Sequence, residues 1–122
     1  MPIEPDDPDL RGFRERDDGK PLVMVQLLRF AEGGRDRYLQ YSREAQQILA
    51  RLGAQVLYAG ECTHPLVAGD GQAWDAVVLV RYPNRTAYLE MVADPAFVAI
   101  AELRRSALRE AVLLPMDAWP GR

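Results

Sequence analysis

The chain has 122 residues, of which 48% are hydrophobic and 27% charged, and its formal net charge is −3. This composition is typical of one globular domain and gives no basic surface of the kind that binds nucleic acid or an anionic membrane. The chain has one cysteine and no apolar run long enough to cross a bilayer, so we expect a cytoplasmic protein without an intrachain disulfide.

The first part of the chain predicts an arm, a strand and a helix. Residues 1–20 are acidic and interrupted by prolines, which is typical of an arm that is flexible or packs on a partner. The nearly continuous apolar run PLVMVQLLRF over residues 21–30 predicts a strand buried on both faces. Residues 35–53 carry apolar side chains at helical spacing and end at a glycine, so they predict a helix.

The rest of the chain predicts three strands and a helical region in two parts. Asn84 is of the residue type that caps a helix start, and Pro95 divides the helical region because proline favours the first turn of a helix. Pro115 restricts the last strand to an edge or a strand end. The predicted elements are strands at residues 54–61 and 74–83, helices at residues 84–94 and from 95 to about 110, and a strand at residues 111–116.

The element order βαββαβ predicts an α+β, ferredoxin-like domain with four antiparallel strands and both helices on one sheet face. We predict this domain over residues 21–117, with the arm at 1–20 before it and a short tail at 118–122 after it. The strands are apolar on both sides, and only the arm is left to cover the second sheet face. A second copy of the same sheet is the expected cover, which gives a homodimer through the open sheet face.

Several segments resemble a known family. PLVMVQLLRF, GAQVLYAGE, WDAVVLVRYPNRTAYLEMVADPAFVAIAELRRSAL and the terminal LLP resemble the family called domain of unknown function 1330, of the dimeric α/β-barrel superfamily. The resemblance covers about residues 21–115 and implies that two subunits form a dimeric α/β barrel. The wider superfamily includes cofactor-independent monooxygenases, haem-dependent enzymes, isomerases and polyketide cyclases. Many relatives have asparagine in the first strand where this chain has Gln26, whose longer amide would shift a ligand contact.

Arg104 is the first candidate for a binding site. At about 100° per residue it lies near the middle of the apolar stripe of its helix, while Arg105 points away. A buried guanidinium needs an acidic partner or an anionic ligand to offset its desolvation. Arg104 therefore binds an organic anion, pairs with an internal acid such as Asp75, or extends its head group to water.

Asp75 is the candidate acid, because it opens the third strand at a sheet end where pocket mouths form. In an apolar setting it would be a general base with a raised pKa. Paired with Arg104 it would have a lowered pKa and would not serve as a base near neutral pH.

Polar side chains on the apolar faces complete the predicted pocket. Tyr38 and Tyr41 are three residues apart on one helix face, and each is either a core residue or one whose hydroxyl reaches a pocket. Tyr58 in the second strand has the same two interpretations. Gln26 is the strongly hydrogen-bonding side chain within VMVQLL and needs a partner if it is buried. Met91 and Phe97 are predicted wall residues of the pocket.

The sequence contains no phosphate loop, dinucleotide fingerprint, nucleophile elbow or zinc motif, so we predict no cofactor and no metal. His64 and Cys62 lie in a loop whose ligand spacing is poor for a metal, and an exposed loop histidine is the simpler interpretation. Cys62 also lacks an orienting base for a nucleophilic role.

These residues lead to two hypotheses of function. The first is an enzyme that acts on a small anionic or phenolic molecule without a tightly bound cofactor, by isomerase-like or cyclase-like proton transfer or by cofactor-independent oxygenation. Arg104 would hold the anion, Tyr38, Tyr58 and Gln26 would position it, and Asp75 would orient Arg104 or take a proton. The alternative is a non-catalytic dimer that binds a small metabolite or serves in assembly.

Overall fold

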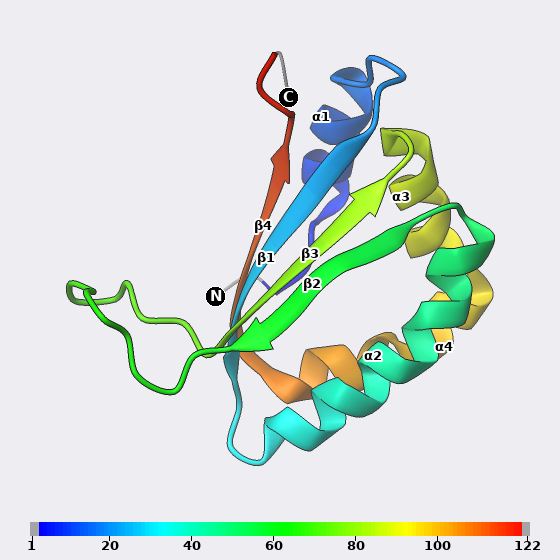
Figure 1. Cartoon of the computed structure of the whole chain (residues 1–122). Helices are drawn as coiled ribbons and strands as arrows, with labels where there is room; N and C mark the ends of the chain where they lie inside the picture. Colours follow the sequence, from blue (N-terminus) through cyan, green and yellow to red (C-terminus); the bar gives the residue numbers. More distant parts are fainter. Residues whose placement is uncertain (1–2, 121–122) are drawn as a thin grey trace.

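A computed structural model describes residues 3–120 and contains four helices and four strands in this part of the chain (Figure 1). None of these helices is both long and apolar enough to cross a membrane. The elements are α1 Asp7–Glu15, β1 Leu22–Phe30, α2 Gly34–Arg51, β2 Gln55–Glu61, β3 Ala76–Tyr82, α3 Arg85–Ala93, α4 Pro95–Ala107 and β4 Leu108–Met116.

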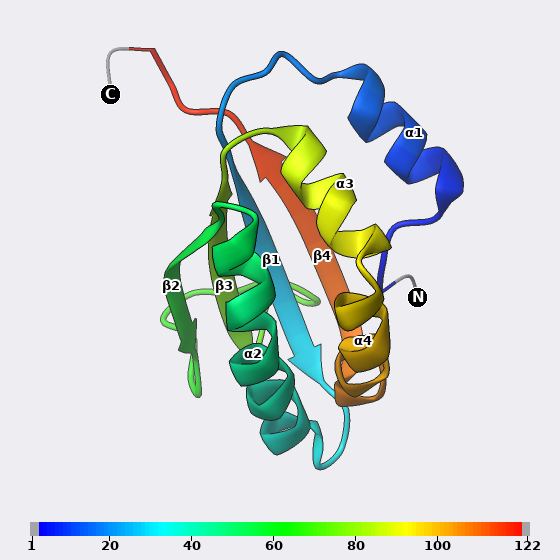
Figure 2. The same cartoon turned by 90° about the vertical axis from the view of Figure 1, so that its right-hand side faces the viewer.

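The four strands form one antiparallel sheet in the order β2-β3-β1-β4, which confirms the predicted ferredoxin-like, α+β arrangement. Helices α2, α3 and α4 cover one face of this sheet, and the other face is open (Figures 1 and 2). The sheet does not close on itself within one chain.

The second helical region is split at the predicted place. Asp94 ends α3 and also caps α4, where its side chain accepts a hydrogen bond from the backbone of Ala96 at 2.8 Å. Pro95 follows in the first turn of α4. The end of α4 differs from the prediction, because Leu108 is already extended and β4 begins there, three residues before the predicted strand.

The main core lies between the sheet and the helices. Alternate residues of β1 and β3 point to this side, since Met24 pairs with Val80 and both are buried. Tyr82 and Leu28 are the largest fully buried side chains among residues 3–120, and burial of side chains of this size stabilises a fold by about 1.5–3 kcal/mol each.

The other residues of these strands point to the open face. Val25 of β1 lies beside Leu79 of β3 and Leu114 of β4, and Leu114 is 40% exposed. The open face therefore has an apolar centre, as the strand composition predicts.

The N-terminal arm differs from our expectation of a flexible or partner-bound segment. Asp6 and Asp9 form a reciprocal capping box that starts α1, with hydrogen bonds of 2.8 and 2.9 Å. Leu10 and Phe13 pack against the core of their own chain, and α1 contacts α3. The predicted tail lacks regular structure over residues 118–120, and residues 121–122 lie outside the described part.

The start of α2 and the end of α4 meet at one carbonyl group. The Ala107 oxygen accepts a hydrogen bond from the backbone of Ala31 at 2.8 Å, and Arg37 donates to the neighbouring Ser106 carbonyl at 2.8 Å. A Cβ atom on Gly34 would overlap the Ala107 oxygen and lie 2.9 Å from its carbonyl carbon. Glycine is therefore needed at position 34 for this close backbone approach.

We expect Gly34→Ala to lower the free energy of unfolding by about 1–3 kcal/mol, because two backbone segments must separate to admit the methyl group. Urea unfolding measures this change. Gly12→Ala is the matched control, because Gly12 also lies in a helix and its Cβ would approach only the flexible end of Arg16. The control should change stability by no more than about 1 kcal/mol, and an equally large loss in both variants would contradict the close-approach argument.

Candidate functional site

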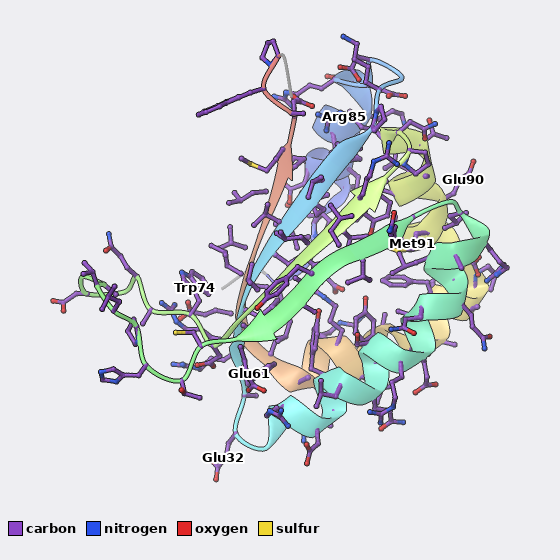
Figure 3. All side chains as sticks on the ribbon, in the orientation of Figure 1. Glu32, Glu61, Trp74, Arg85, Glu90 and Met91 are labelled. Carbon is purple, nitrogen blue, oxygen red and sulfur yellow. The ribbon has the colours of Figure 1, made fainter. Side chains whose placement is uncertain are left out.

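A cavity of about 270 Å³ lies between the helix-covered sheet face and helices α2, α3 and α4, and the N-terminal segment borders it. Its wall is mostly apolar, and Figure 3 shows Met91 of α3 in the space between the helices and the sheet. The structure brings six of the eight predicted site residues to this cavity, namely Gln26, Tyr38, Tyr41, Met91, Phe97 and Arg104.

Arg104 projects from the inner face of α4 and is 7% exposed. Its Nη1 donates a hydrogen bond to the backbone oxygen of Ile3 at 2.8 Å. Its Nη2 is buried and has no hydrogen-bond partner within residues 3–120. A buried guanidinium donor in an otherwise apolar wall is a group that an anionic ligand would satisfy.

Four tyrosines surround this positive charge. Tyr38 and Tyr41 of α2 have ring centroids 5.4 Å apart, as do Tyr82 of β3 and Tyr88 of α3. Burial raises the pKa of all four, and the charge of Arg104 opposes this rise at each; the pKa of Tyr88 is raised to about 12. At neutral pH these side chains are therefore neutral phenols that can donate hydrogen bonds, and none is poised as a base.

Gln26 lies on the floor of the cavity at the centre of the sheet. Its neighbours across the two adjoining strands are Val78 of β3 and Leu113 of β4, and all three line the cavity. The amide is thus a polar group between two aliphatic residues, where it can contact a ligand with either a donor or an acceptor.

Asp75 does not pair with Arg104 and does not line the cavity, so the alternative in which these two residues form an ion pair is wrong. The Oδ2 atom of Asp75 instead accepts a hydrogen bond from the backbone of Phe30 at 2.8 Å. This contact lies at the register shift between β1 and β4 after Arg29, where a backbone donor loses its regular strand partner.

Tyr58 also lies outside the cavity and is 58% exposed. Strict alternation would place it on the same sheet face as Val56, which lines the cavity. The register of β2 shifts between these two residues, so Tyr58 pairs with Leu79, a residue of the open face. The bulge therefore moves Tyr58 to the opposite face.

Sequence reasoning missed two tyrosines of the cavity. Tyr88 is three residues before the predicted wall residue Met91, so helical spacing would have placed the two on one face. Tyr82 follows Val78 and Val80 at alternate positions of β3, which is the corresponding signal in a strand.

The N-terminal segment closes one side of the cavity. Glu4 lines the cavity and pairs with Arg105, whose Nε lies 3.0 Å from the glutamate Oε1. Both side chains are about half exposed. The sequence gives no simple signal for this contact, because it joins residues separated by almost the whole chain.

No cluster of three or more His, Cys, Asp or Glu side chains that could hold a metal ion occurs between residues 3 and 120. His64 and Cys62 are exposed in the loop between β2 and β3, away from the cavity.

The raised tyrosine pKa values predict a loss of stability at alkaline pH. Below about pH 10, Tyr88 is protonated in both the folded and the unfolded chain, and its contribution to stability is complete. As the pH rises from about 10 to about 12, the unfolded chain loses this proton first, so the free energy of unfolding falls by up to about 1.4 kcal/mol per pH unit for each such tyrosine. Urea unfolding at several pH values between about 8 and 11 measures the slope.

Tyr88→Phe should make this alkaline slope shallower, because it removes a hydroxyl whose pKa is raised by burial. A wild-type slope in Tyr88→Phe would show that the hydroxyl is not desolvated in the folded chain.

The chain has similarity to solved structures over nearly its whole length. A protein of unknown function from Rhodopseudomonas palustris is 26% identical, with 96% of each chain covered and a TM-score of 0.86. A dimeric protein of unknown function with a ferredoxin-like fold from Bacteroides fragilis is 10% identical, with 80% of this chain and 96% of that chain covered and a TM-score of 0.58.

A third structure carries the name of an activity. It is described as "Putative antibiotic biosynthesis monooxygenase" from Bacteroides thetaiotaomicron and is 23% identical, with 84% of this chain and 91% of that chain covered and a TM-score of 0.58. At this identity the likeness shows the shared fold alone.

No curated protein matches the chain. A family model described as "Domain of unknown function (DUF1330)" matches residues 28–116, which include the last three residues of β1 and the whole of α2, β2, β3, α3, α4 and β4. The chain therefore belongs to the domain of unknown function 1330 family.

Proposed function

We propose that the Arg104 cavity binds a small organic anion, a carboxylate or a phenolate, and holds it for a reaction that needs no tightly bound cofactor. The observation that carries this proposal is the buried Nη2 of Arg104, which has no partner in residues 3–120. A carboxylate or phenolate oxygen would satisfy this donor, and the planar guanidinium fork suits such a group.

The other polar groups of the cavity support an anionic ligand. Tyr38, Tyr41 and Tyr88 are neutral at physiological pH and can donate hydrogen bonds to an oxygen held at Arg104. The aliphatic and aromatic wall fits the apolar body of such a molecule. A cavity of about 270 Å³ limits the ligand to a small one.

For an enzyme, two reaction classes agree with this wall. In isomerase-like or cyclase-like proton transfer, water would take the proton from one substrate atom and return it to another, while Arg104 and the neutral phenols would stabilise the enolate or phenolate formed between the two steps. In cofactor-independent oxygenation, the same groups would stabilise the electron-rich anion that reacts with oxygen. Asp75 has no part in either scheme, because its carboxylate is bonded to the Phe30 backbone outside the cavity.

Non-catalytic binding is the second candidate, and a specific observation favours it. A proton-transfer enzyme needs a base in its site. The Asp75 carboxylate accepts a hydrogen bond from the Phe30 backbone outside the cavity, and Glu4, which does line the cavity, is paired with Arg105. The two candidates differ in whether a bound compound is changed. Incubation of each bound compound with protein and air, followed by NMR of the recovered compound, separates them.

We also propose that two copies associate through their open sheet faces and form a dimeric α/β barrel. The apolar centre of this face, with Val25, Leu79 and Leu114 side by side, supports the proposal. The Bacteroides fragilis protein with the related fold is described as dimeric, which agrees with it.

Arg104→Met tests the binding site. We expect small carboxylates or phenols to raise the melting temperature of the wild-type protein by several degrees, because a ligand at about 100 times its Kd adds about 2.7 kcal/mol of stability. Arg104→Met should lose this increase, and its own melting temperature should stay the same or rise, because an apolar side chain replaces a buried charge that is incompletely paired. Thermal unfolding against a panel of such compounds measures both effects.

Arg43→Met is the matched control, because Arg43 is an exposed helix arginine outside the cavity. It should keep the ligand-induced increase. If Arg104→Met also kept it, or if it unfolded at a much lower temperature and no compound stabilised the wild type, the proposed anion site would be wrong.

Leu114→Glu tests the sheet-face dimer. A carboxylate at the apolar centre of this face should prevent association and give a particle of one chain mass, 13.7 kDa, where the wild type gives twice that mass. Light scattering after size exclusion measures the mass. Leu39→Glu, at a similarly exposed position on α2, should remain dimeric. The reverse pattern would place the interface on the helical side.

A further inference from the structure

A second cavity, of about 820 Å³, lies between α1, the start of α3 and β4, which is an edge strand of the sheet. It borders the Arg104 cavity, and Tyr88 and Met24 line both. Figure 2 shows α1 beside α3, on the side of the molecule where β4 lies. The wall of this second cavity contains none of the eight site residues predicted from the sequence.

Arg85 is the buried charge of this cavity. It is the first residue of α3 and is 7% exposed. Its guanidinium carbon lies 4.5 Å from the ring centroid of Phe13 in α1, a stacking contact that fixes the plane of the group. Figure 3 shows Arg85 at the end of the sheet beside α1.

The hydrogen-bonding capacity of Arg85 is incompletely used. Its Nη1 is buried and has no partner in the described residues. Its Nη2 lies 4.0 Å from Oδ1 of Asp117, at the outer limit of an ion pair, and the Asp117 side chain is 69% exposed. A water-exposed carboxylate at this distance compensates a buried guanidinium poorly.

The surroundings of Arg85 favour a carboxylate on an apolar body over a free inorganic anion. Phe13 and Leu10 from α1 and Leu113 from β4 line the cavity, and the hydroxyl of Tyr88 stays neutral because burial raises its pKa to about 12. This phenol is a neutral polar group in the wall that the two cavities share.

Two acidic residues of the cavity wall do not occupy Arg85. Asp9 accepts a hydrogen bond from the backbone of Asp6 in the capping box, and Glu4 pairs with Arg105. The exposed Asp117 is thus the acid that a ligand would displace.

We propose that this cavity is a second binding site, in which Arg85 binds the carboxylate of a small apolar molecule in place of Asp117. The carboxylate would bind at Arg85 and not at Arg104, in a cavity that adjoins the Arg104 cavity and shares Met24 and Tyr88 with it. The chain would then bind two carboxylates, one at each buried arginine.

Fluorine NMR with 4-fluorobenzoate as the probe tests the proposal on the 122-residue chain. We expect two probe molecules per chain in the wild type and one in Arg85→Met. Arg104→Met should also bind one, and the double variant none. Arg14→Met, an exposed arginine of α1 outside both cavities, should bind two. The neutral analogue 4-fluorobenzamide should not bind at Arg85, because it lacks the charge.

Asp117→Asn gives an independent measurement if Arg85→Met does not fold. Removal of the competing carboxylate should tighten probe binding at the Arg85 site several-fold, and the exposed position should keep the fold intact. Unchanged or weaker binding in Asp117→Asn would overturn the proposal, as would two bound probes in Arg85→Met.

The outcomes also separate this site from the proposed function. Loss of a probe only in Arg104→Met overturns the second site and leaves the first. Loss of a probe only in Arg85→Met overturns the Arg104 site and leaves the Arg85 site. Displacement of the probe from Arg85 by inorganic phosphate at an equal concentration would overturn the preference for an apolar carboxylate.

Discussion

The close contact between the start of α2 and the end of α4 determines how the rest of the molecule is arranged. The Ala107 carbonyl accepts from Ala31 and lies against Gly34 without room for a side chain. Tyr38 lies one helical turn after Gly34, and Arg104 lies about one turn before Ala107. The contact therefore brings the phenol and the guanidinium to the same end of the cavity, where the charge of Arg104 lowers the pKa of Tyr38 against the effect of burial.

This arrangement gives a wall rich in hydrogen-bond donors within an apolar core. Arginine has no acceptor, and a neutral phenol in a low-dielectric setting is a good donor and a poor base. The cavity therefore has the polarity of a site for an oxygen anion. Arg85 is a second buried hydrogen-bond donor in apolar surroundings, since its guanidinium lies at the start of α3 and stacks on Phe13.

The sequence predicted the fold and much of the cavity because both depend on local periodicity. Helical spacing alone placed Tyr38 and Arg104 on inward faces, and both are buried. It failed where an irregular backbone changes the periodicity, since a bulge turns Tyr58 to the open face and a register shift in β1 engages Asp75. The partner of a buried charge is also a long-range property, and no local pattern indicates that Arg104 bonds to Ile3. The helix in the arm did have a local signal, the two aspartates of the capping box around Pro8, which its high charge and prolines obscured.

The N-terminal segment that borders the cavity has a consequence for the kinetics of exchange. It is held by the part-buried hydrogen bond from Arg104 to the Ile3 carbonyl and by the half-exposed pair of Glu4 and Arg105. Dissolved salt screens the exposed pair more than the part-buried bond. If the cavity binds an anion as proposed, salt would weaken the Glu4 contact first, and a compound would then enter and leave the cavity faster.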